Sequence, residues 1–371
     1  MTAPRRDPEI LLRQWWEEGA PRAIAVGLTA LSIGYRLGLA ARERAYGWGF
    51  LATGRLPCPV ISIGNITLGG SGKTPMVELA ALALRELGAS PAVVSRGYAR
   101  QSRGVAVVAD RDGIKLDARR AGDEPLLLAE RLPGIAVVVG ENRFEAGRAA
   151  VERCGATAVV LDDGFQNRTV SKDLEIVVLN GHAPWGNGRL FPRGALREPM
   201  SALARADLVA ITNATDMGAR AASGRVRSHN ERAPVIRAAY VVTEAREMRS
   251  GSRVEAKALA GRRLLAFCGL ASPKSFADTL AGLGIQVAAI MEFPDHHWYT
   301  AADLDGLAQH AKGIGAEGLV TTEKDWVRLR GLEPPPSPLW VLPVRLAVEA
   351  GHDDWLRALE RALASSGARR I

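Results

Sequence analysis

The residues best suited to chemistry form a glycine-rich loop that ends in Lys73 and Thr74. The loop follows an apolar run over residues 59–64 and precedes a helical pattern over 75–87. Glycines let successive backbone N–H groups turn toward anionic oxygens, and the positive end of the following helix favours the same charge. The lysine adds a point charge, and the threonine hydroxyl is a ligand for Mg²⁺. The segment predicts a phosphate site for ATP, built from Thr67, Leu68, Gly69, Gly70, Ser71, Gly72, Lys73 and Thr74.

One position departs from the usual P-loop pattern, G-x-x-x-x-G-K-S/T. The first glycine of that pattern is expected at position 67, where this chain has Thr67, and the nearest upstream glycine is Gly64. A glycine-rich loop alone is often only a turn. With a β-type run before it and a helix after it, we interpret this loop as a nucleotide-phosphate site.

Two adjacent carboxylates, Asp162 and Asp163, end an apolar run over residues 158–161 and precede Gly164. In a P-loop fold, an acid at the tip of such a strand holds Mg²⁺ directly or through water. An Asp-Asp-Gly sequence also makes a good turn after a strand. With the P-loop present, we predict that Asp162, Asp163 and Thr74 organise Mg²⁺.

Asp123 and His296 are candidates for proton transfer. Asp123 precedes a helical run over residues 124–131, so its carboxylate either caps that helix or acts as a general base on an acceptor hydroxyl, and the sequence favours the two equally. His296 and His297 follow an apolar run over 287–291 and would face opposite sides of a strand, which makes them a poor metal pair. In a loop at a strand tip, a histidine there can orient an acid across a cleft.

Several arginines stand on glycine-containing loops that follow predicted strands. Guanidinium is always charged and binds anionic oxygens in a bidentate way, although most surface arginines are simply solvated. The candidates for clamping phosphate oxygens are Arg96, Arg143, Arg193 and Arg197.

An alternation of short apolar runs and helical patterns must position these residues. Strands are predicted over 60–63, 92–95, 105–109, 135–139, 158–161, 176–179 and 208–211, and helices over 75–87, 124–131, 143–152 and 200–206. Such a chain is typical of an α/β fold of the P-loop NTPase type, with a mostly parallel sheet and helices on both faces. Ligands then gather at the carboxyl ends of the strands.

The second part of the chain repeats this alternation on a smaller scale. Residues 213–237 are polar and rich in Gly, Ala, Ser and Arg, which predicts a linker. Strands are then expected over 235–242, 264–267, 287–291, 318–321 and 339–341, and helices over 276–283, 301–312 and 353–363. The predicted parts are an N-terminal region over 1–50, a P-loop core over 51–235, and a second, smaller α/β domain over 236–371 that closes over the site.

The N-terminal region differs in composition from the rest. Trp15 and Trp16 lead into a charge-free run over 23–35, and arginines then alternate with tyrosine and tryptophan. The run is shorter than the roughly 20 residues that cross a bilayer, so spanning is disfavoured. Aromatic rings beside arginines favour an amphipathic helix that lies at the headgroup level of a membrane. The alternative is an ordinary helix packed on the domain.

Composition limits the classes of partner. With 371 residues, of which 47% are hydrophobic, the chain is long and apolar enough for two globular domains. The 48 Lys and Arg against 40 Asp and Glu give a net charge of +8, which favours an anionic partner without distinguishing nucleic acid, a phospholipid surface or a phosphorylated substrate. The three cysteines are odd in number and widely spaced, so they indicate neither a disulfide framework nor a zinc site. This cysteine usage favours a reducing compartment.

Seven short motifs, in order, resemble those of the tetraacyldisaccharide 4'-kinases of lipid A biosynthesis. They are GGSGKTP at 69–75, SRGY at 95–98, GDEP at 122–125, LDDGFQ at 161–166, REP at 197–199, DH at 295–296 and TEKD at 322–325. The set extends over nearly the whole chain and is far more specific than any single motif. One departure is Asn167, which stands where the family usually has histidine.

The resemblance implies a kinase that moves the γ-phosphate of ATP to the 4'-hydroxyl of a tetraacylated glucosamine disaccharide 1-phosphate, giving lipid IVA. It implies that Lys73 and Thr74 hold phosphate and Mg²⁺, that Asp123 is the base, and that His296 pairs with it. The residues expected to bind the lipid substrate are Arg96, Arg143 and Glu198. The expected partners are the lipid A disaccharide precursor and an anionic membrane surface, without nucleic acid. We expect a monomer, peripheral to the cytoplasmic face of the bacterial inner membrane.

Two other classes of function fit the residues less well. One is a P-loop ATPase or GTPase that switches a membrane partner, in which Asp123 is only a helix cap. The other is a basic adaptor for a membrane or nucleic acid with a vestigial P-loop. A kinase releases ADP only with its acceptor, a switch releases it slowly without one, and an adaptor releases none.

Overall fold

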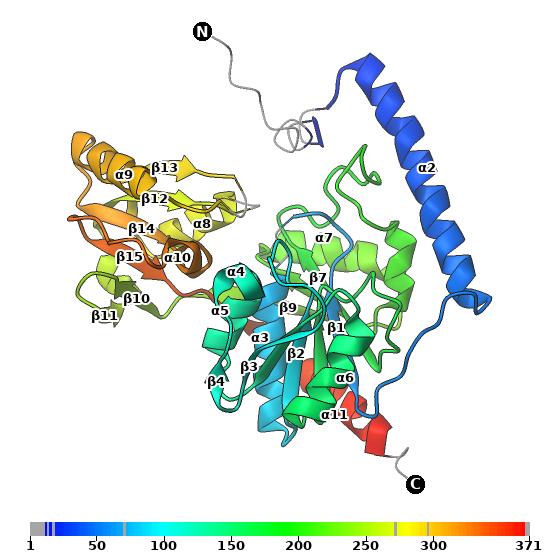
Figure 1. Cartoon of the computed structure of the whole chain (residues 1–371). Coiled ribbons are helices and arrows are strands. Elements are labelled where there is room, and N and C mark those ends of the chain that lie inside the picture. The colour runs from blue at the N-terminus through cyan, green and yellow to red at the C-terminus, as the bar shows by residue number, and fades with distance from the viewer. Residues whose placement is uncertain are drawn as a thin grey trace. The chain divides into compact units, whose positions relative to one another are not determined.

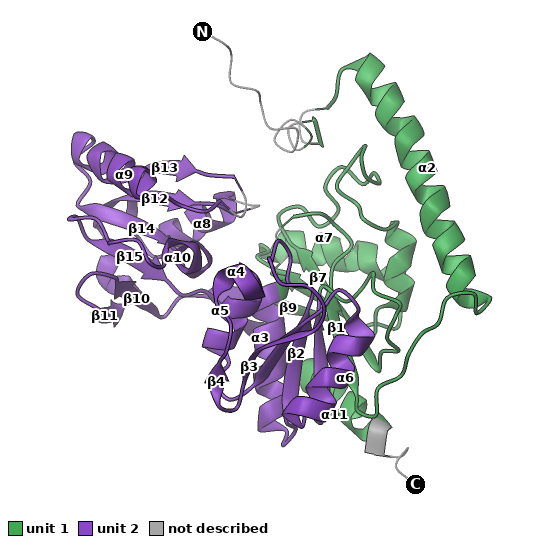
Figure 2. Ribbon diagram, viewed as in Figure 1, with its two compact units in different colours: residues 1–73, 163–237, 350–371 green, residues 74–162, 238–349 purple. Residues whose placement is uncertain are grey.

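The chain forms two compact units, each made from stretches that are distant in sequence (Figure 2). Unit 1 consists of residues 1–73, 163–237 and 350–371, and unit 2 of residues 74–162 and 238–349. This computed structural model describes residues 12, 15–16, 19–69, 72–270, 273–294 and 297–367. The three sequential parts expected from the sequence stay a prediction.

Unit 1 holds a long N-terminal helix and a parallel sheet (Figure 1). Its strands follow the order β9-β8-β7-β1, and β7 is parallel to both β1 and β8. The elements are α2 (Arg22–Gly47), β1 (Val60–Gly64), β7 (Leu174–Asn180), η1 (Met200–Arg205), β8 (Leu208–Thr212), α7 (Asp216–Arg227), β9 (Val235–Val241) and α11 (His352–Gly367).

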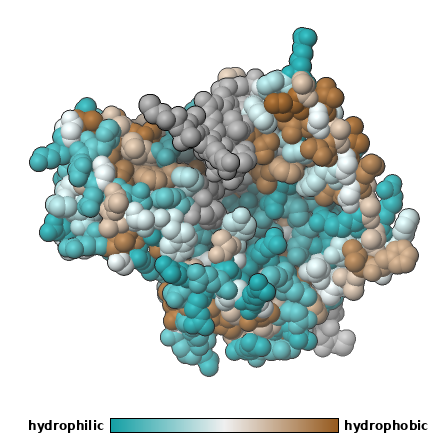
Figure 3. Space-filling model, turned by 45° about the horizontal axis from the view of Figure 1, so that its top comes forward, coloured by the Kyte–Doolittle hydropathy of each residue, from teal (hydrophilic) through white to brown (hydrophobic). Residues whose placement is uncertain are grey.

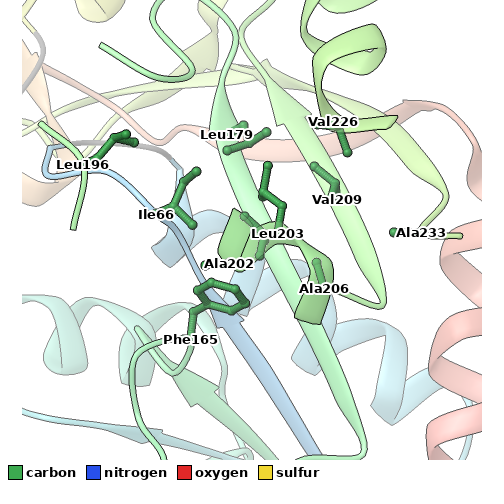
Figure 4. Close-up of a cluster of buried hydrophobic side chains, with 11 residues drawn as sticks. Ile66, Phe165, Leu179, Leu196, Ala202, Leu203, Ala206, Val209, Val226 and Ala233 are labelled. Atoms are coloured by element: carbon green, nitrogen blue, oxygen red, sulfur yellow. The ribbon is translucent and has the colours of Figure 1, made fainter. Parts of the chain in front are cut away.

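The core of unit 1 joins these strands to the turn that follows Asp163. Phe165 from that turn is buried together with Leu179 of β7, Leu203 of η1 and Val209 of β8 (Figure 4). Ile66, just after β1, belongs to the same cluster. Burying such side chains contributes about 1.5–3 kcal/mol each, so the turn is held in place by the sheet.

Unit 2 contains two sheets. The strand orders are β6-β2-β5-β3-β4 and β11-β10-β15-β14-β12-β13. The first set consists of α3 (Lys73–Glu86), β2 (Pro91–Ser95), β3 (Ala106–Asp110), β4 (Gly113–Ile114), α4 (Ala118–Ala121), α5 (Asp123–Arg131), β5 (Ala136–Val139), α6 (Arg143–Cys154) and β6 (Ala158–Asp162). The second set consists of β10 (Glu244–Glu247), β11 (Arg253–Glu255), η2 (Ala256–Leu259), β12 (Arg263–Cys268), α8 (Pro273–Gly282), β13 (Gln286–Glu292), α9 (Ala301–Gly313), β14 (Gly318–Thr322), α10 (Glu323–Leu329) and β15 (Leu339–Leu342). The strand β16 (Arg345–Ala350) is not part of this six-stranded sheet.

Alternate residues of β12 show that the second sheet is covered on both faces. Leu264 and Ala266 belong to one buried cluster, which also contains Phe276 of α8. Leu265 and Phe267 belong to another cluster, with residues of α9. Because successive side chains of a strand point to opposite faces, α8 and α9 lie on opposite sides of this sheet.

Buried ion pairs connect α3, α5 and α10 within unit 2. The guanidinium of Arg131 on α5 lies 2.9 Å from Glu78 of α3, and its Nε donates to Glu323 of α10 at 2.8 Å. All three side chains are nearly inaccessible to solvent. Removing one partner of such a pair leaves a buried charge and costs about 3–5 kcal/mol. The first residues of α10 are therefore fixed to α5.

The fold class predicted from the sequence is confirmed, and most predicted strands and helices are present within a few residues. The predicted linker is wrong, because residues 213–237 contain α7 and the first part of β9. Only Ala222 and Val226 of α7 are buried, so the helix carries too few apolar residues to show a period. Thr215 caps it by accepting from the backbone N–H of Gly218 at 3.2 Å. The predicted helix at 200–206 is the 3₁₀ helix η1.

The N-terminal helix is longer than the charge-free run suggested. Helix α2 has 26 residues, because it continues through Arg36, Arg42 and Arg44. By length and composition alone it is long and apolar enough to cross a membrane, which is weak evidence for a helix near the N-terminus. The sequence disfavoured a membrane-spanning helix because the charge-free run was too short, and the length of α2 removes that reason.

Gly64 allows the close approach between β1 and the turn at Phe165. A Cβ at position 64 would lie 2.5 Å from Cβ and 2.6 Å from the backbone N of Phe165. We expect Gly64→Ala to lower the free energy of unfolding by about 1–3 kcal/mol, because the turn must shift. Urea denaturation measures this change.

The matched control is Gly224→Ala on the exposed surface of α7, where a Cβ would meet nothing within 4 Å. Alanine is the better helix former, so this variant should be as stable as the wild type or slightly more stable. Equal urea midpoints for Gly64→Ala and the wild type would show that the close approach does not constrain the fold.

Candidate active site

The site in unit 1 is built around a turn that begins at Asp163, directly after β6. Asp163 has a φ of 51°, in the left-handed region that aspartate tolerates better than most residues. The next residue, Gly164, donates its N–H to the carbonyl of Ile63 in β1 at 2.9 Å. This hydrogen bond and the buried Phe165 fix the turn against the carboxyl end of β1.

Two cationic side chains converge on the Asp163 carboxylate. Arg197 Nη1 donates to both carboxylate oxygens, at 2.8 and 3.0 Å, and Lys73 Nζ lies 3.6 Å from Oδ1. Arg197 also donates to Asn65 Oδ1 at 3.3 Å. All three charged groups are partly exposed. Two positive charges against one negative charge, just after a glycine-rich loop, favour an anionic oxygen such as that of a phosphate.

The described part of the glycine-rich loop runs beside the segment that carries Arg197. Thr67 forms an antiparallel bridge with Leu196, and Leu68 donates its N–H to the carbonyl of Ala195 at 2.7 Å. Gly69 has a φ of 107°, a conformation that favours glycine. Gly70 and Ser71 lie outside the described residues. The structure therefore places Arg197 in register with the start of the loop, which the sequence did not indicate.

The structure gives Asp162 a different environment from Asp163. Asp162 is buried at the end of β6, and its Oδ2 accepts a hydrogen bond from the hydroxyl of Ser95 at 2.8 Å. Ser95 ends the neighbouring strand β2, and the next residue, Arg96, is exposed. The sequence drew attention only to Arg96. Ser95 was visible in the same motif, but a small hydroxyl at a strand end carries no signal of its own.

Asp123 lies in unit 2 as the first residue of α5. Its Oδ1 accepts a hydrogen bond from the backbone N–H of the next residue, Glu124, at 3.0 Å. The N-cap position of α5 is Gly122, and among the described residues no side chain caps this helix. Its Oδ2 lies 3.6 Å from Nε of Arg328 on α10. The expected cap is therefore wrong, and the alternative role as a general base stays a prediction. The charged partner Arg328 was not predicted from the sequence. His296, the predicted partner of Asp123, lies outside the described residues, and its role stays a prediction.

Two residues predicted to bind substrate are engaged in internal contacts. Arg143 is buried at the start of α6, and its Nη1 donates to the carbonyl of Gly140 at 2.8 Å. Glu198 is buried and accepts from Arg205 at 2.6 Å, with Arg42 of α2 at 3.9 Å. Their contacts with substrate stay predictions, and Glu198 would have to change at least one ion pair to reach a ligand.

The residues present fit a magnesium ion. Thr74, Asp162 and Asp163 offer the hard oxygen donors that Mg²⁺ prefers, and Mg²⁺ commonly takes one or two carboxylates together with substrate phosphates and water. Two cations already pair with the Asp163 carboxylate, and Asp162 accepts from Ser95, so Mg²⁺ would share these carboxylates with their present partners. Within the described ranges there is no group of three or more His, Cys, Asp and Glu side chains that could hold a metal alone. Such a site would need the phosphates to complete it.

Comparisons with known proteins agree over nearly the full length. The family model for Tetraacyldisaccharide-1-P 4'-kinase matches residues 24–363. A Tetraacyldisaccharide 4'-kinase from Syntrophus aciditrophicus is 40% identical over 351 residues, which cover 91% of this chain and 94% of that protein. One from Anaeromyxobacter dehalogenans is 43% identical over 328 residues, 85% of each chain. The crystal structure of LpxK from Aquifex aeolicus in complex with ATP matches with a TM-score of 0.72 and 30% identity, covering 92% of this chain and 99% of that one.

We expect Lys73→Ala to weaken binding of ATP about 10- to 100-fold, because a hydrogen bond from a charged group contributes about 1.5–3 kcal/mol. Titration with a fluorescent ATP analogue measures this loss. Lys115→Ala is the matched control, since Lys115 is an exposed lysine whose Nζ pairs with Asp110 at 2.5 Å. Unchanged affinity in a folded Lys73→Ala variant would mean that the loop is structural.

Proposed function

This chain belongs to the family of tetraacyldisaccharide-1-P 4'-kinases, and from that premise we propose how its residues carry out the reaction. The enzyme is a lipid kinase of lipid A biosynthesis, which transfers the γ-phosphate of ATP to the 4'-hydroxyl of a tetraacylated glucosamine disaccharide 1-phosphate. The main observation that supports our assignment of roles to individual residues is the convergence of Lys73 and Arg197 on Asp163.

In our proposal, the donor phosphates occupy the glycine-rich loop. Lys73 and Arg197 compensate the negative charge on the transferred phosphoryl group, which is where most of the catalysis of phosphoryl transfer comes from. Thr74, Asp162 and Asp163 would hold Mg²⁺, which supplies further compensation of that charge when bound. Ser95 holds the Asp162 carboxylate in one orientation through its hydroxyl.

The acceptor chemistry is assigned to Asp123. The oxygen of the 4'-hydroxyl attacks the γ-phosphorus, the bond from phosphorus to the bridging oxygen of ADP breaks, and the hydroxyl proton passes to the carboxylate of Asp123. His296 is proposed to orient that carboxylate. Arg96, Arg143 and Glu198 are proposed to bind the phosphorylated disaccharide.

We further propose that α2 attaches the enzyme to the membrane that holds its lipid substrate. Val26, Ile33 and Leu37 are all more than half exposed, and at 100° per residue they share one face of the helix. Figure 3 shows hydrophobic residues gathered on the exposed surface around this helix. Trp48 and Phe50 are exposed just beyond its end, as expected for residues that settle at a lipid interface. Because ATP is the donor, the proposed location is the cytoplasmic face of the inner membrane.

Another face of α2 holds the segment that carries Arg197. The hydroxyl of Tyr35 donates to the carbonyl of Arg197 at 2.9 Å, and that of Ser32 donates to the carbonyl of Leu190 at 2.9 Å. Arg193 donates to the carbonyl of Ala25 and to Thr29. These contacts support a helix that both meets the membrane and positions one side of the nucleotide site.

The proposed function is tested by transfer of labelled γ-phosphate from ATP to a purified tetraacylated disaccharide 1-phosphate in mixed micelles. Label should enter the lipid phase, and release of ADP should depend on the acceptor. An acceptor that lacks the 4'-hydroxyl is the control and should accept no label. Release of ADP at the same rate without acceptor, with no labelled lipid, would instead identify a nucleotide switch.

A second experiment tests the membrane role of α2. Deleting residues 1–44 should weaken association with liposomes, but it would also remove Tyr35 and its contact with Arg197. The sharper variant is Val26→Ser with Ile33→Ser and Leu37→Ser, which leaves the loop contacts in place. We expect association with anionic vesicles to weaken by about 10³-fold or more, because several methyl and methylene groups leave the lipid and each costs about 0.8 kcal/mol. The KM for lipid should rise, and the KM for ATP should not.

The matched control for α2 is Tyr35→Phe, which keeps the exposed apolar face and removes one hydrogen bond to the loop. It should bind vesicles like the wild type. If the triple serine variant also sediments like the wild type, the exposed face of α2 is not the membrane contact.

A further inference from the structure

One motif has no role in the reaction described above: the TEKD sequence at 322–325, which begins α10. Within it, Glu323 forms the buried ion pair with Arg131. Asp325 instead accepts hydrogen bonds from other side chains, among them Tyr299. The residue that connects this motif to the proposed reaction is Arg328, one turn further along α10. Its side chain is 0% exposed, and it lies beside Asp123.

The surroundings of Arg328 fix its position from several directions. Its Nη2 donates to Asp325 Oδ1 at 3.0 Å and to the carbonyl of Gly269 at 3.2 Å, and its Nη1 donates to the carbonyl of His297 at 3.3 Å. These acceptors come from α10 and from the segments that follow β12 and β13. Since guanidinium is planar with a fixed fork of donors, contacts from three segments leave it little rotational freedom.

Asp325 is itself held rigidly. It accepts hydrogen bonds from the hydroxyls of Tyr299 and Thr322, at 2.9 and 2.6 Å, and from the backbone N–H of Gly269 at 2.9 Å. Its side chain is 0% exposed. A buried carboxylate with this many hydrogen-bond donors is held in one orientation. Asp325 therefore orients Arg328, and Nε of Arg328 faces the Asp123 carboxylate at 3.6 Å.

We propose that Arg328 is a positioning residue for Asp123, and that the TEKD motif serves to hold it. This inference rests on the proposed role of Asp123 as the general base. The distance of 3.6 Å is longer than a hydrogen bond, so Arg328 and Asp123 form an ion pair without a hydrogen bond. The attraction holds Oδ2 on the side of α5 that faces α10, where the carboxylate is positioned to accept the hydroxyl proton.

The remaining charged groups on the packed elements are already paired or exposed. Lys324 pairs with Glu124 at 3.0 Å, and Arg131 pairs with Glu78 and Glu323. Arg119 and Arg120 of α4 are exposed, and Asp110 of β3 pairs with Lys115. Arg328 is thus the buried cation that the described part of the chain places against Asp123.

A double-mutant cycle on the full-length enzyme tests this inference through kcat. Arg328→Met should lower kcat about 10²-fold, the cost expected when a catalytic group is misplaced by about 1 Å. The KM for ATP should stay unchanged. In an Asp123→Asn background the same substitution should cost less than about threefold, because residues that act as a unit have non-additive effects. Arg328→Lys should recover about tenfold in kcat, since it restores the charge without the fork.

The matched control is Arg100→Met, which removes another arginine of unit 2 whose side chain is nearly inaccessible and pairs with Glu141 at 2.8 Å. The fold-change in kcat that this substitution causes, per folded molecule, should be the same in the wild-type and the Asp123→Asn backgrounds. Urea denaturation reports the folded fraction of every variant, and if Arg328→Met does not fold, Arg328→Lys carries the same cycle.

The outcomes separate this inference from the proposed function. Equal losses of kcat for Arg328→Met in the wild-type and Asp123→Asn backgrounds, or no loss at all, would overturn the positioning role while the kinase reaction stands. Normal phosphate transfer by the Asp123→Asn variant would overturn the base assignment and this inference with it. A wild-type enzyme that labels no lipid would overturn the proposed function itself.

Discussion

The close contact between Gly64 and the backbone of Phe165 is the constraint on which the nucleotide site depends. A strand residue without a side chain lets the turn at 163–166 lie directly against the end of β1. Phe165 anchors the turn in the core, which fixes the backbone position of its first residue, Asp163. Asp163 then meets Lys73, which follows the loop that leaves the same strand. Packing in the core thus determines where charges meet at the surface.

Electrostatics plays the corresponding part in unit 2. Helices α5 and α10 carry two buried arginines, Arg131 and Arg328, each placed between carboxylates from different elements. Burying these charges is expensive, and each is stable only while all its partners are present. The arrangement is a poor way to maximise stability, since apolar residues would pack at lower cost. It is a good way to specify a single relative placement of α5 and α10, because a shifted helix would leave a charge unpaired.

The sequence predicted the fold well because its strands are short, apolar and β-branched, and because glycines mark the turns between them. The same reasoning failed at α7, where alanines, glycine and arginines replace the apolar period, and only the packed structure shows Val226 in the core. The motifs named Lys73, Asp162 and Asp163 as candidate site residues, and Asp123, whose role stays a prediction. They did not identify Ser95, Asn65 or Arg328, whose contacts join positions far apart in the chain. Such contacts depend on strand order and helix packing, which no local pattern contains.

The attachment of α2 to the rest of unit 1 has a consequence for how this protein can vary. Ser32, Tyr35 and Trp16 each donate to backbone carbonyls of the segment 190–197. Ser32 also accepts from the backbone N–H of Arg193. Backbone groups are present whatever the side chains are, so these hydrogen bonds survive side-chain exchange in the segment, except at Arg193, whose own side chain donates to α2. The donors on α2 have no such freedom. Substitutions that adapt the enzyme to lipid substrates of different chemistry should therefore accumulate in the segment, while the polar residues along the docked face of the helix stay the same.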